Sequence, residues 1–200
     1  MIKVLALYGS PRRPGNTASL LDEFLKGVSW SGVAVESIRI SDLKFSPCQE
    51  YNVCLKTGEC CIKDEMTPVY GKLLTADLVV LAAPIFFYNL PAQAKALIDR
   101  SQSLWARKYI LKKKEDAVPG KKRLGFFISV GGTKGEHLFD GAIKTVKYFF
   151  DAINVEYAGE LLFRQIGVKG EIEKHSEALK QAYQVGQSIV QKMTGDARTT

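Results

Sequence analysis

The chain has 200 residues, 46% of them hydrophobic and 24% charged, which is the composition of one folded domain with a sizeable core. The net charge of +7 would suit nucleic acid, but no recognition-helix, RNP or zinc-finger pattern accompanies it, and the densest basic run, 107–114, is followed at once by Glu115 and Asp116. The longest apolar stretch, 78–88, is broken by Pro84 and is too short to span a bilayer. We therefore expect a cytoplasmic protein with no nucleic-acid partner and no membrane segment.

Strand and helix patterns alternate along the whole chain. Apolar, β-branched runs predict strands at 3–8, 33–40, 77–83, 123–130 and 155–163. Apolar residues at helical spacing predict helices at 17–29, 67–75, 91–104, 136–154 and 171–193. Nearly continuous apolar strands separated by helices indicate a parallel sheet covered on both faces. We therefore expect one domain over 1–195, a three-layer, doubly wound α/β sandwich with a five-stranded parallel sheet of flavodoxin-like order 2-1-3-4-5, and a short tail at 196–200.

The loop between the first predicted strand and the first predicted helix has the character of an anion site. Residues 9–19 are rich in glycine, hydroxyl and amide groups, and Arg12 and Arg13 add positive charge. Free N–H groups and the dipole at the following helix N-terminus attract anions. The spacing fits neither a Walker A sequence nor a G-x-G-x-x-G fingerprint. We expect a phosphate here, with a capped turn that binds no ligand as the alternative. The further side-chain donors are Ser10, Asn16, Thr17 and Ser19.

Two more loops are expected at the same edge of the sheet, after the third and fourth strands. The first provides three adjacent aromatic side chains stiffened by prolines, which suits a planar heteroaromatic ring. Its residues are Pro84, Ile85, Phe86, Phe87, Tyr88 and Asn89. The second offers backbone N–H donors with little side chain in the way, and its residues are Ser129, Gly131, Gly132 and Thr133. Ligands of doubly wound sheets bind at this edge. Core packing and a simple turn are the alternatives.

Together these loops resemble the NAD(P)H-dependent FMN reductase and iron–sulfur flavoprotein family of flavodoxin-like proteins. The resemblance runs from residue 4 to about 193 and is most specific in GSPR…GNT at 9–17 and in PIFF…P…AK…IDR at 84–100. It implies bound FMN, with the ring against 84–89 and its pyrimidine end closed by Gly131, Gly132 and Thr133. It places the FMN phosphate on Ser10, Arg12, Asn16, Thr17 and Ser19.

The same resemblance implies an oxidoreductase that passes electrons from NAD(P)H through FMN to a flavin, a quinone or another small acceptor. The flavin carries the chemistry, so we expect no catalytic side chain. Two alternatives remain open from the sequence. One is a flavodoxin-type or iron–sulfur electron carrier that works with protein redox partners. The other is a flavin-sensing module without turnover.

All four cysteines lie in one insertion, 44–66, and without a secretory signal such clustering suggests a metal or redox site before structural disulfides. In the iron–sulfur members of the family, four cysteines bind a [4Fe–4S] cluster. The resemblance aligns three of this chain's cysteines with the first, third and fourth ligands, but Tyr51 occupies the second position. We therefore expect no metal site, and a cluster that recruits the remaining cysteine is the alternative. The cysteines are Cys48, Cys54, Cys60 and Cys61.

A second long segment, 103–122, is expected to be a loop with aromatic and basic residues. Trp105 and Tyr109 are four residues apart and would share a helical face, as paired aromatics at the centre of an interface do. The family resemblance implies subunits that complete each other's flavin pockets. We therefore expect a homodimer or homotetramer in which this loop contributes to the partner's site. The alternative is that both aromatics pack onto their own domain.

Overall fold

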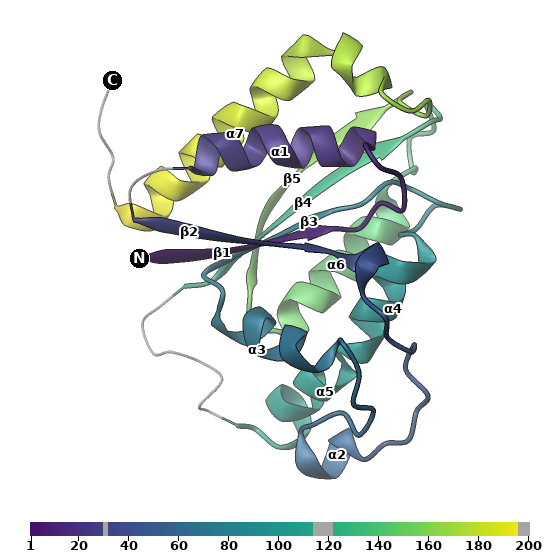
Figure 1. Ribbon diagram of the computed structural model, residues 1–200, viewed down its shortest axis with the longest axis vertical. Helices are drawn as coiled ribbons and strands as arrows, with labels where there is room; N and C mark the ends of the chain where they lie inside the picture. Colours follow the sequence, from purple (N-terminus) through teal and green to yellow (C-terminus); the bar gives the residue numbers. More distant parts are fainter. Residues whose placement is uncertain (30–31, 114–121, 196–200) are drawn as a thin grey trace.

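A five-stranded parallel sheet forms the centre of the fold in the computed structural model, which describes residues 1–29, 32–113 and 122–195 (Figure 1). The strands are β1 (Ile2–Tyr8), β2 (Val33–Arg39), β3 (Leu78–Ala82), β4 (Leu124–Gly131) and β5 (Glu156–Arg164). Every neighbouring pair is parallel, and the order across the sheet is β2-β1-β3-β4-β5. The predicted order is confirmed. The expected tail, 196–200, lies outside the described residues.

Helices cover both faces of this sheet, which confirms the predicted three layers (Figure 1). The helices on one face are α1 (Asn16–Val28) and α7 (Ser176–Thr194). Those on the other face are α3 (Thr67–Thr75), α4 (Ala92–Arg100) and α6 (Asp140–Ala152). A short 3₁₀ turn, η4 (Glu171–Lys174), precedes α7 where a continuous helix was expected.

Two apolar layers form the core, one on each side of the sheet. Side chains alternate across a strand, so Leu5 and Leu7 of β1 enter the layer under α3, α4 and α6, while Val4 and Ala6 enter the layer under α1 and α7. All five residues of β3 are buried because this central strand is covered on both faces.

The α1–α7 contact is unusually close because each helix contributes a glycine to it. A Cβ on Gly27 of α1 would lie 2.0 Å from the Tyr183 carbonyl oxygen, and one on Gly186 of α7 would lie 2.1 Å from the Phe24 carbonyl oxygen. No other residue type fits either position without moving a backbone. The two helices therefore pack backbone against backbone.

A buried arginine closes the amino edge of the sheet. Arg123 donates hydrogen bonds to the carbonyl oxygens of Ala76 and Ile153, each over 2.7 Å, and to that of Leu73. These carbonyls lie at the C-terminal ends of α3 and α6, where helical N–H partners run out. One side chain thus satisfies the ends of two helices.

The two long segments both contain helix. The cysteine-bearing insertion follows η1 (Ile40–Asp42) and forms a one-turn helix, α2 (Cys54–Thr57). The segment predicted as a loop from 103 is helical up to 110, as α5 (Gln102–Trp105) and the π-helical turn η2 (Ala106–Ile110). That part of the prediction was wrong, since no glycine or proline interrupts this stretch and the buried Leu104 and Ala106 hold it to the domain. Residues 114–121 of the predicted loop lie outside the described residues.

Candidate functional site

Three loops leave the carboxyl edge of the sheet side by side, after β1, β3 and β4, at residues 9–15, 83–91 and 132–139. Backbone hydrogen bonds tie them together. The Gly9 N–H donates to the Ala82 carbonyl oxygen over 2.7 Å, and the Ile85 N–H donates to that of Val130 over 3.0 Å. A Cβ on Gly9 would lie 2.9 Å from the Ala83 Cβ. The structure therefore brings together the three loops that the sequence predicts to share a site.

The first loop ends at an uncapped helix N-terminus. Gly15 is the N-cap of α1 and provides no side-chain hydrogen bond to the first turn. The N–H groups of that turn point toward the loop with the positive end of the helix dipole. Ser10 and Thr17 are buried beside them, and the Ser10 hydroxyl accepts a hydrogen bond from the Arg12 N–H over 3.2 Å. Hydroxyls and free amides at a helix start have the chemistry of a phosphate site.

Two of the predicted phosphate ligands also have partners in the loop that follows β5. The Asn16 side chain donates to the Val168 carbonyl oxygen over 2.7 Å and accepts from the Ile172 N–H over 3.3 Å. The Arg12 guanidinium donates to the Gly167 carbonyl oxygen over 2.9 Å. Sequence reasoning missed this bracing, because the partners are more than 150 residues apart. The assignment of Asn16 and Arg12 to a phosphate stays a prediction.

That bracing loop has an anchor of its own in Glu171. Its carboxylate accepts the N–H groups of Gly167 and Val168 over 2.7 and 2.9 Å. These two bonds hold the pKa of Glu171 below its usual value. Arg13, the other cation of the first loop, is paired with Asp42. Of the two arginines that the sequence singles out, Arg12 is therefore the one held against the loop after β5.

The second loop presents an aromatic tip to solvent. Phe86 and Asn89 exchange two backbone hydrogen bonds, of 2.8 and 3.0 Å, which close a tight turn around Phe87 and Tyr88. Both turn residues have positive φ angles, 49° and 60°, a conformation that costs energy for side chains of this size. Phe86, Phe87 and Tyr88 are all exposed, so core packing does not explain them. Pro84 is half-buried at the base of the loop.

The third loop contains glycines whose backbone lies against other parts of the site. A Cβ on Gly131 would meet the Leu138 side chain at 2.5 Å, and one on Gly132 would lie 3.5 Å from the Gly167 Cα. The Ser129 hydroxyl is fully buried and donates to the Ala83 carbonyl oxygen over 2.7 Å. The Ser129 side chain thus links two of the loops, and its contact with the cofactor stays a prediction.

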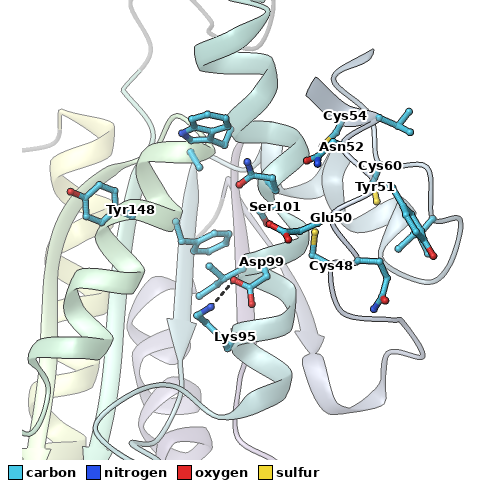
Figure 2. Close-up of a pocket in the computed structure, with 18 of the residues that line it drawn as sticks. Cys48, Glu50, Tyr51, Asn52, Cys54, Cys60, Lys95, Asp99, Ser101 and Tyr148 are labelled. Carbon is cyan, nitrogen blue, oxygen red and sulfur yellow. Dashed lines mark hydrogen bonds and ion pairs between the residues drawn. The ribbon is translucent and has the colours of Figure 1, made fainter. Parts of the chain in front are cut away.

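A hollow lies between the cysteine-bearing insertion and helices α4, α5 and α6 (Figure 2). Its volume is about 660 Å³, and all four cysteines line it. Lys95 and Asp99 of α4 form an ion pair at its wall, with 2.6 Å between nitrogen and oxygen. Thr145 of α6 also lines it and reaches the Asn89 amide oxygen of the aromatic loop over 3.4 Å. The hollow thus adjoins the back of that loop.

Arg100, at the end of α4, holds the cysteine-bearing insertion in place. Its buried guanidinium forms two hydrogen bonds with the Asp64 carboxylate, over 2.7 and 3.1 Å. It also donates to the carbonyl oxygens of Ser46 over 2.7 Å and Ile62 over 3.2 Å, and to the Tyr70 hydroxyl over 3.2 Å. Burial alone would raise the pKa of Asp64, but the bonds from Arg100 and two backbone amides outweigh it, so that pKa is lowered.

The aromatic pair of the second long segment packs onto its own domain. The Trp105 and Tyr109 rings are tilted against each other, with 5.8 Å between centroids. The Tyr109 hydroxyl donates to Asp151 of α6 over 2.6 Å, and the Lys108 ammonium reaches the same carboxylate over 2.8 Å. These contacts support the alternative that the sequence left open. A role for the segment in an interface stays a prediction.

Comparison with known proteins decides the family. The model of the NADPH-dependent FMN reductase family matches residues 2–157. The chain belongs to that family. It is therefore a flavoprotein oxidoreductase of the FMN-binding kind. Within the described residues, none of the helices has the length and apolar character needed to cross a bilayer.

Individual members of the family resemble the chain to different extents. It is 30% identical over 154 residues to an iron–sulfur flavoprotein of Methanosarcina thermophila, a match that covers 77% of this chain and 74% of that protein. It is 37% identical over 103 residues to one of Methanocaldococcus jannaschii, and there it spans only about half of each protein (52% and 53%). A solved NAD(P)H:quinone oxidoreductase from Methanothermobacter marburgensis shares the fold, with a TM-score of 0.69, 17% identity and coverage of 94% and 96%.

The relatives are named iron–sulfur flavoproteins, but the cysteines of this chain do not fit an iron–sulfur cluster. Such a cluster takes four cysteine thiolates. Tyr51, at the second ligand position, is 65% exposed, and Figure 2 shows its ring at the outer side of the group, away from Lys95 and Asp99. In the described parts of the chain, His, Cys, Asp and Glu side chains nowhere form a group of three that could hold a metal ion.

Proposed function

We propose that the protein binds FMN at the carboxyl edge of the sheet and passes electrons from NAD(P)H to a flavin, a quinone or another small acceptor. One observation carries the proposal. An uncapped helix N-terminus with buried hydroxyls, an exposed aromatic turn and a glycine loop leave β1, β3 and β4 side by side. Bound FMN supplies the two-electron chemistry, and the chain supplies binding, orientation and charge.

Each loop would hold a different part of the flavin nucleotide. Ser10, Thr17 and Ser19 would donate hydroxyls to the phosphate, together with the first N–H groups of α1. Arg12 would add charge, and Asn16 would brace the loop after β5 and donate its remaining N–H. The ring would lie against Pro84 to Asn89, which spans the exposed turn.

The glycine loop would meet the polar end of the ring. Backbone N–H groups of Gly131, Gly132 and Thr133 would face the pyrimidine edge, where negative charge gathers when the ring accepts electrons. The missing side chains let the backbone approach closely. Phe87 is fully exposed in a single chain, so we also propose a homodimer or homotetramer in which a second copy covers this turn.

Flavin binding by a Thr17 variant tests the phosphate site. Thr17→Val keeps the shape of the side chain and removes one donor, so FMN affinity should fall by roughly 10- to 150-fold, or about 1.5–3 kcal/mol. Riboflavin has no phosphate, and its affinity should be unchanged. Thr75→Val, at the far end of α3, is the matched control, since that hydroxyl donates to the Gly71 carbonyl oxygen within its own helix. Equal loss of affinity for FMN and riboflavin would place the phosphate elsewhere.

An electron carrier is the second candidate, because the curated relatives are named iron–sulfur flavoproteins rather than reductases. Steady-state turnover separates the two. A reductase loaded with FMN oxidises NADH or NADPH when a quinone or free flavin is added, whereas a carrier does not. A carrier loaded with FMN would instead exchange electrons only with a reduced or oxidised protein partner such as a ferredoxin.

A further inference from the structure

Four thiols face one hollow, and the family's cluster does not account for them. All four cysteines are free, and three of them are half-buried while Cys61 is exposed. They line the same cavity of about 660 Å³, which is within the size range of small-molecule sites. Figure 2 shows Cys48, Cys54 and Cys60 on the insertion's side of this cavity, opposite the α6 residue Tyr148.

Cys54 is half-buried, and each of the other three cysteines influences its thiol. Its pKa is raised, first by burial and then by the nearby Cys60, Cys48 and Cys61, in that order of influence. Cys60 is therefore its strongest electrostatic neighbour. The two are joined by one turn of helix and a reversal at Gly58, whose φ of 77° directs the chain back.

The reversal between the two cysteines is held by its own hydrogen bonds and by η2. The Thr57 hydroxyl donates to the Val53 carbonyl oxygen and accepts from the Glu59 N–H, each over 3.1 Å. A Cβ on Gly58 would lie 2.8 Å from the Arg107 side chain, so this turn rests directly on the helical segment below it. Arg100 fixes the rest of the insertion at both ends, through Ser46 and Asp64.

We propose that Cys54 and Cys60 form a thiol–disulfide couple that exchanges with a low-molecular-weight disulfide in this cavity. The Cys60 thiolate attacks one sulfur of the small disulfide, which forms a mixed disulfide and releases one thiolate. Cys54 then attacks the Cys60 sulfur and expels the second thiolate, and the two protons of the protein thiols end on the two released thiols. Two protein thiols are oxidised, one small disulfide is reduced, and no other reactant is needed.

The assignment of roles follows from the surroundings. Cys54 and Cys60 both line the cavity, and the raised pKa of Cys54 disfavours it as the first nucleophile, so that role is assigned to Cys60. Among the other cysteines, Cys60 influences the Cys54 thiol most, followed by Cys48 and then Cys61. This chemistry needs neither FMN nor a metal, so it stands or falls independently of the proposed flavin site.

Thiol counting on the flavin-free protein tests the couple. Fully reduced protein is incubated without air with glutathione disulfide or 2-hydroxyethyl disulfide, and free thiols are counted after denaturation. The count should fall from four to two, with an intact mass about 2 Da lower and no retained adduct. Trypsin cleaves after Lys56, between the partners, so a 54–60 disulfide joins two peptides, 45–56 and 57–63.

Variants separate the members of the couple from their neighbours. Cys54→Ser should trap the small thiol on Cys60 as a stable adduct, and Cys60→Ser should abolish formation of the intramolecular disulfide. The matched controls Cys48→Ser and Cys61→Ser should form the disulfide between Cys54 and Cys60 as the parent does. Thermal unfolding of each reduced variant checks that the fold is kept, and FMN titration of the same samples reports on the flavin site separately.

Three results would overturn the proposal. The first is a count that stays at four thiols in folded protein. The second is a disulfide within one tryptic peptide, which would assign the chemistry to 48–54 or 60–61. The third is anaerobically purified protein that carries about four iron and four sulfide per chain and loses them in Cys48→Ser, because the thiols would then be cluster ligands.

Discussion

Arg123 and Arg100 are both buried, yet they hold different parts of the molecule. Arg123 donates to backbone carbonyls at the ends of α3 and α6, within the layers that the doubly wound fold requires. Arg100 donates to the cysteine-bearing insertion, through Ser46 and Asp64. Arg123 therefore joins two helices of the basic fold, and Arg100 attaches the insertion to that fold.

The surroundings of the two arginines also shift their pKa values in opposite directions. Burial lowers the pKa of Arg123, with the Asp77 carboxylate acting in the opposite direction. Burial also acts to lower the pKa of Arg100, but Asp64 and Tyr70 raise it above its usual value. The attachment of the insertion thus depends on the ion pair between Arg100 and Asp64. At the edge of the sheet, Arg123 instead donates to neutral backbone carbonyls. The comparison predicts that the insertion can be released while the sheet stays folded.

Removal of Arg123 should have the largest effect on stability. Arg123→Met leaves the carbonyls of two helix ends buried without donors, which should lower the free energy of unfolding by about 3–5 kcal/mol. Urea denaturation of the variant and the parent measures this difference in the free energy of unfolding. Lys122→Met is the control, since the adjacent Lys122 is exposed and pairs with the exposed Glu156. Equal small losses in both variants would show that the edge is not closed by Arg123.

Removal of Arg100 should release the insertion and leave the sheet intact. In Arg100→Met the free energy of unfolding should fall by about 2–3 kcal/mol, less than for Arg123. Trypsin should cut rapidly after Lys56 and Lys63 before the rest of the domain is digested. Lys26→Met, on the exposed side of α1, should leave both sites protected. Global digestion without an early cut in the insertion would contradict the separation of the two regions.

Low pH should weaken the attachment of the insertion more than it weakens the rest of the fold. The folded-state pKa of Asp64 is lowered, so its ion pair contributes in full above the unfolded-state pKa of about 3.9 and is lost as the pH falls through the folded value. Asp64→Asn should be less stable than the parent by about 1–3 kcal/mol at pH 6, and this difference should shrink below pH 4. Urea midpoints of both proteins from pH 6 to 3 measure the trend. A constant difference would show that the charge of Asp64 is not involved.

A change at Tyr51 should have the smallest effect on stability, within about 0.5 kcal/mol, because the side chain is exposed. Tyr51→Cys supplies the donor that the family's cluster lacks here, so anaerobic reconstitution should load iron on this variant and not on the parent. Tyr148→Cys, an exposed tyrosine lining the same cavity, is the control and should stay free of iron. Iron in the parent at the level of Tyr51→Cys would show that the parent's own cysteines already suffice.

The sheet order could be predicted because each strand is an apolar run and each crossover a helix. The loops at its carboxyl edge were predictable for the same reason, since parallel strands end together. The contacts of Asn16 with Val168 and of Arg100 with Ser46 were not, because each joins residues far apart in sequence and depends on side-chain geometry alone. The hydrogen bond from the Ser129 hydroxyl to the Ala83 carbonyl oxygen could not be predicted either, for the same reason.

The glycine contact between α1 and α7 bears on how the chain folds as it leaves the ribosome. α1 is made early, but the helix that packs on it backbone to backbone is completed only at residue 194. Until then α1 and its side of the sheet lack their cover, and that apolar layer is open to chaperones or to other nascent chains. Translation must therefore pass residue 194 before this half of the core can close.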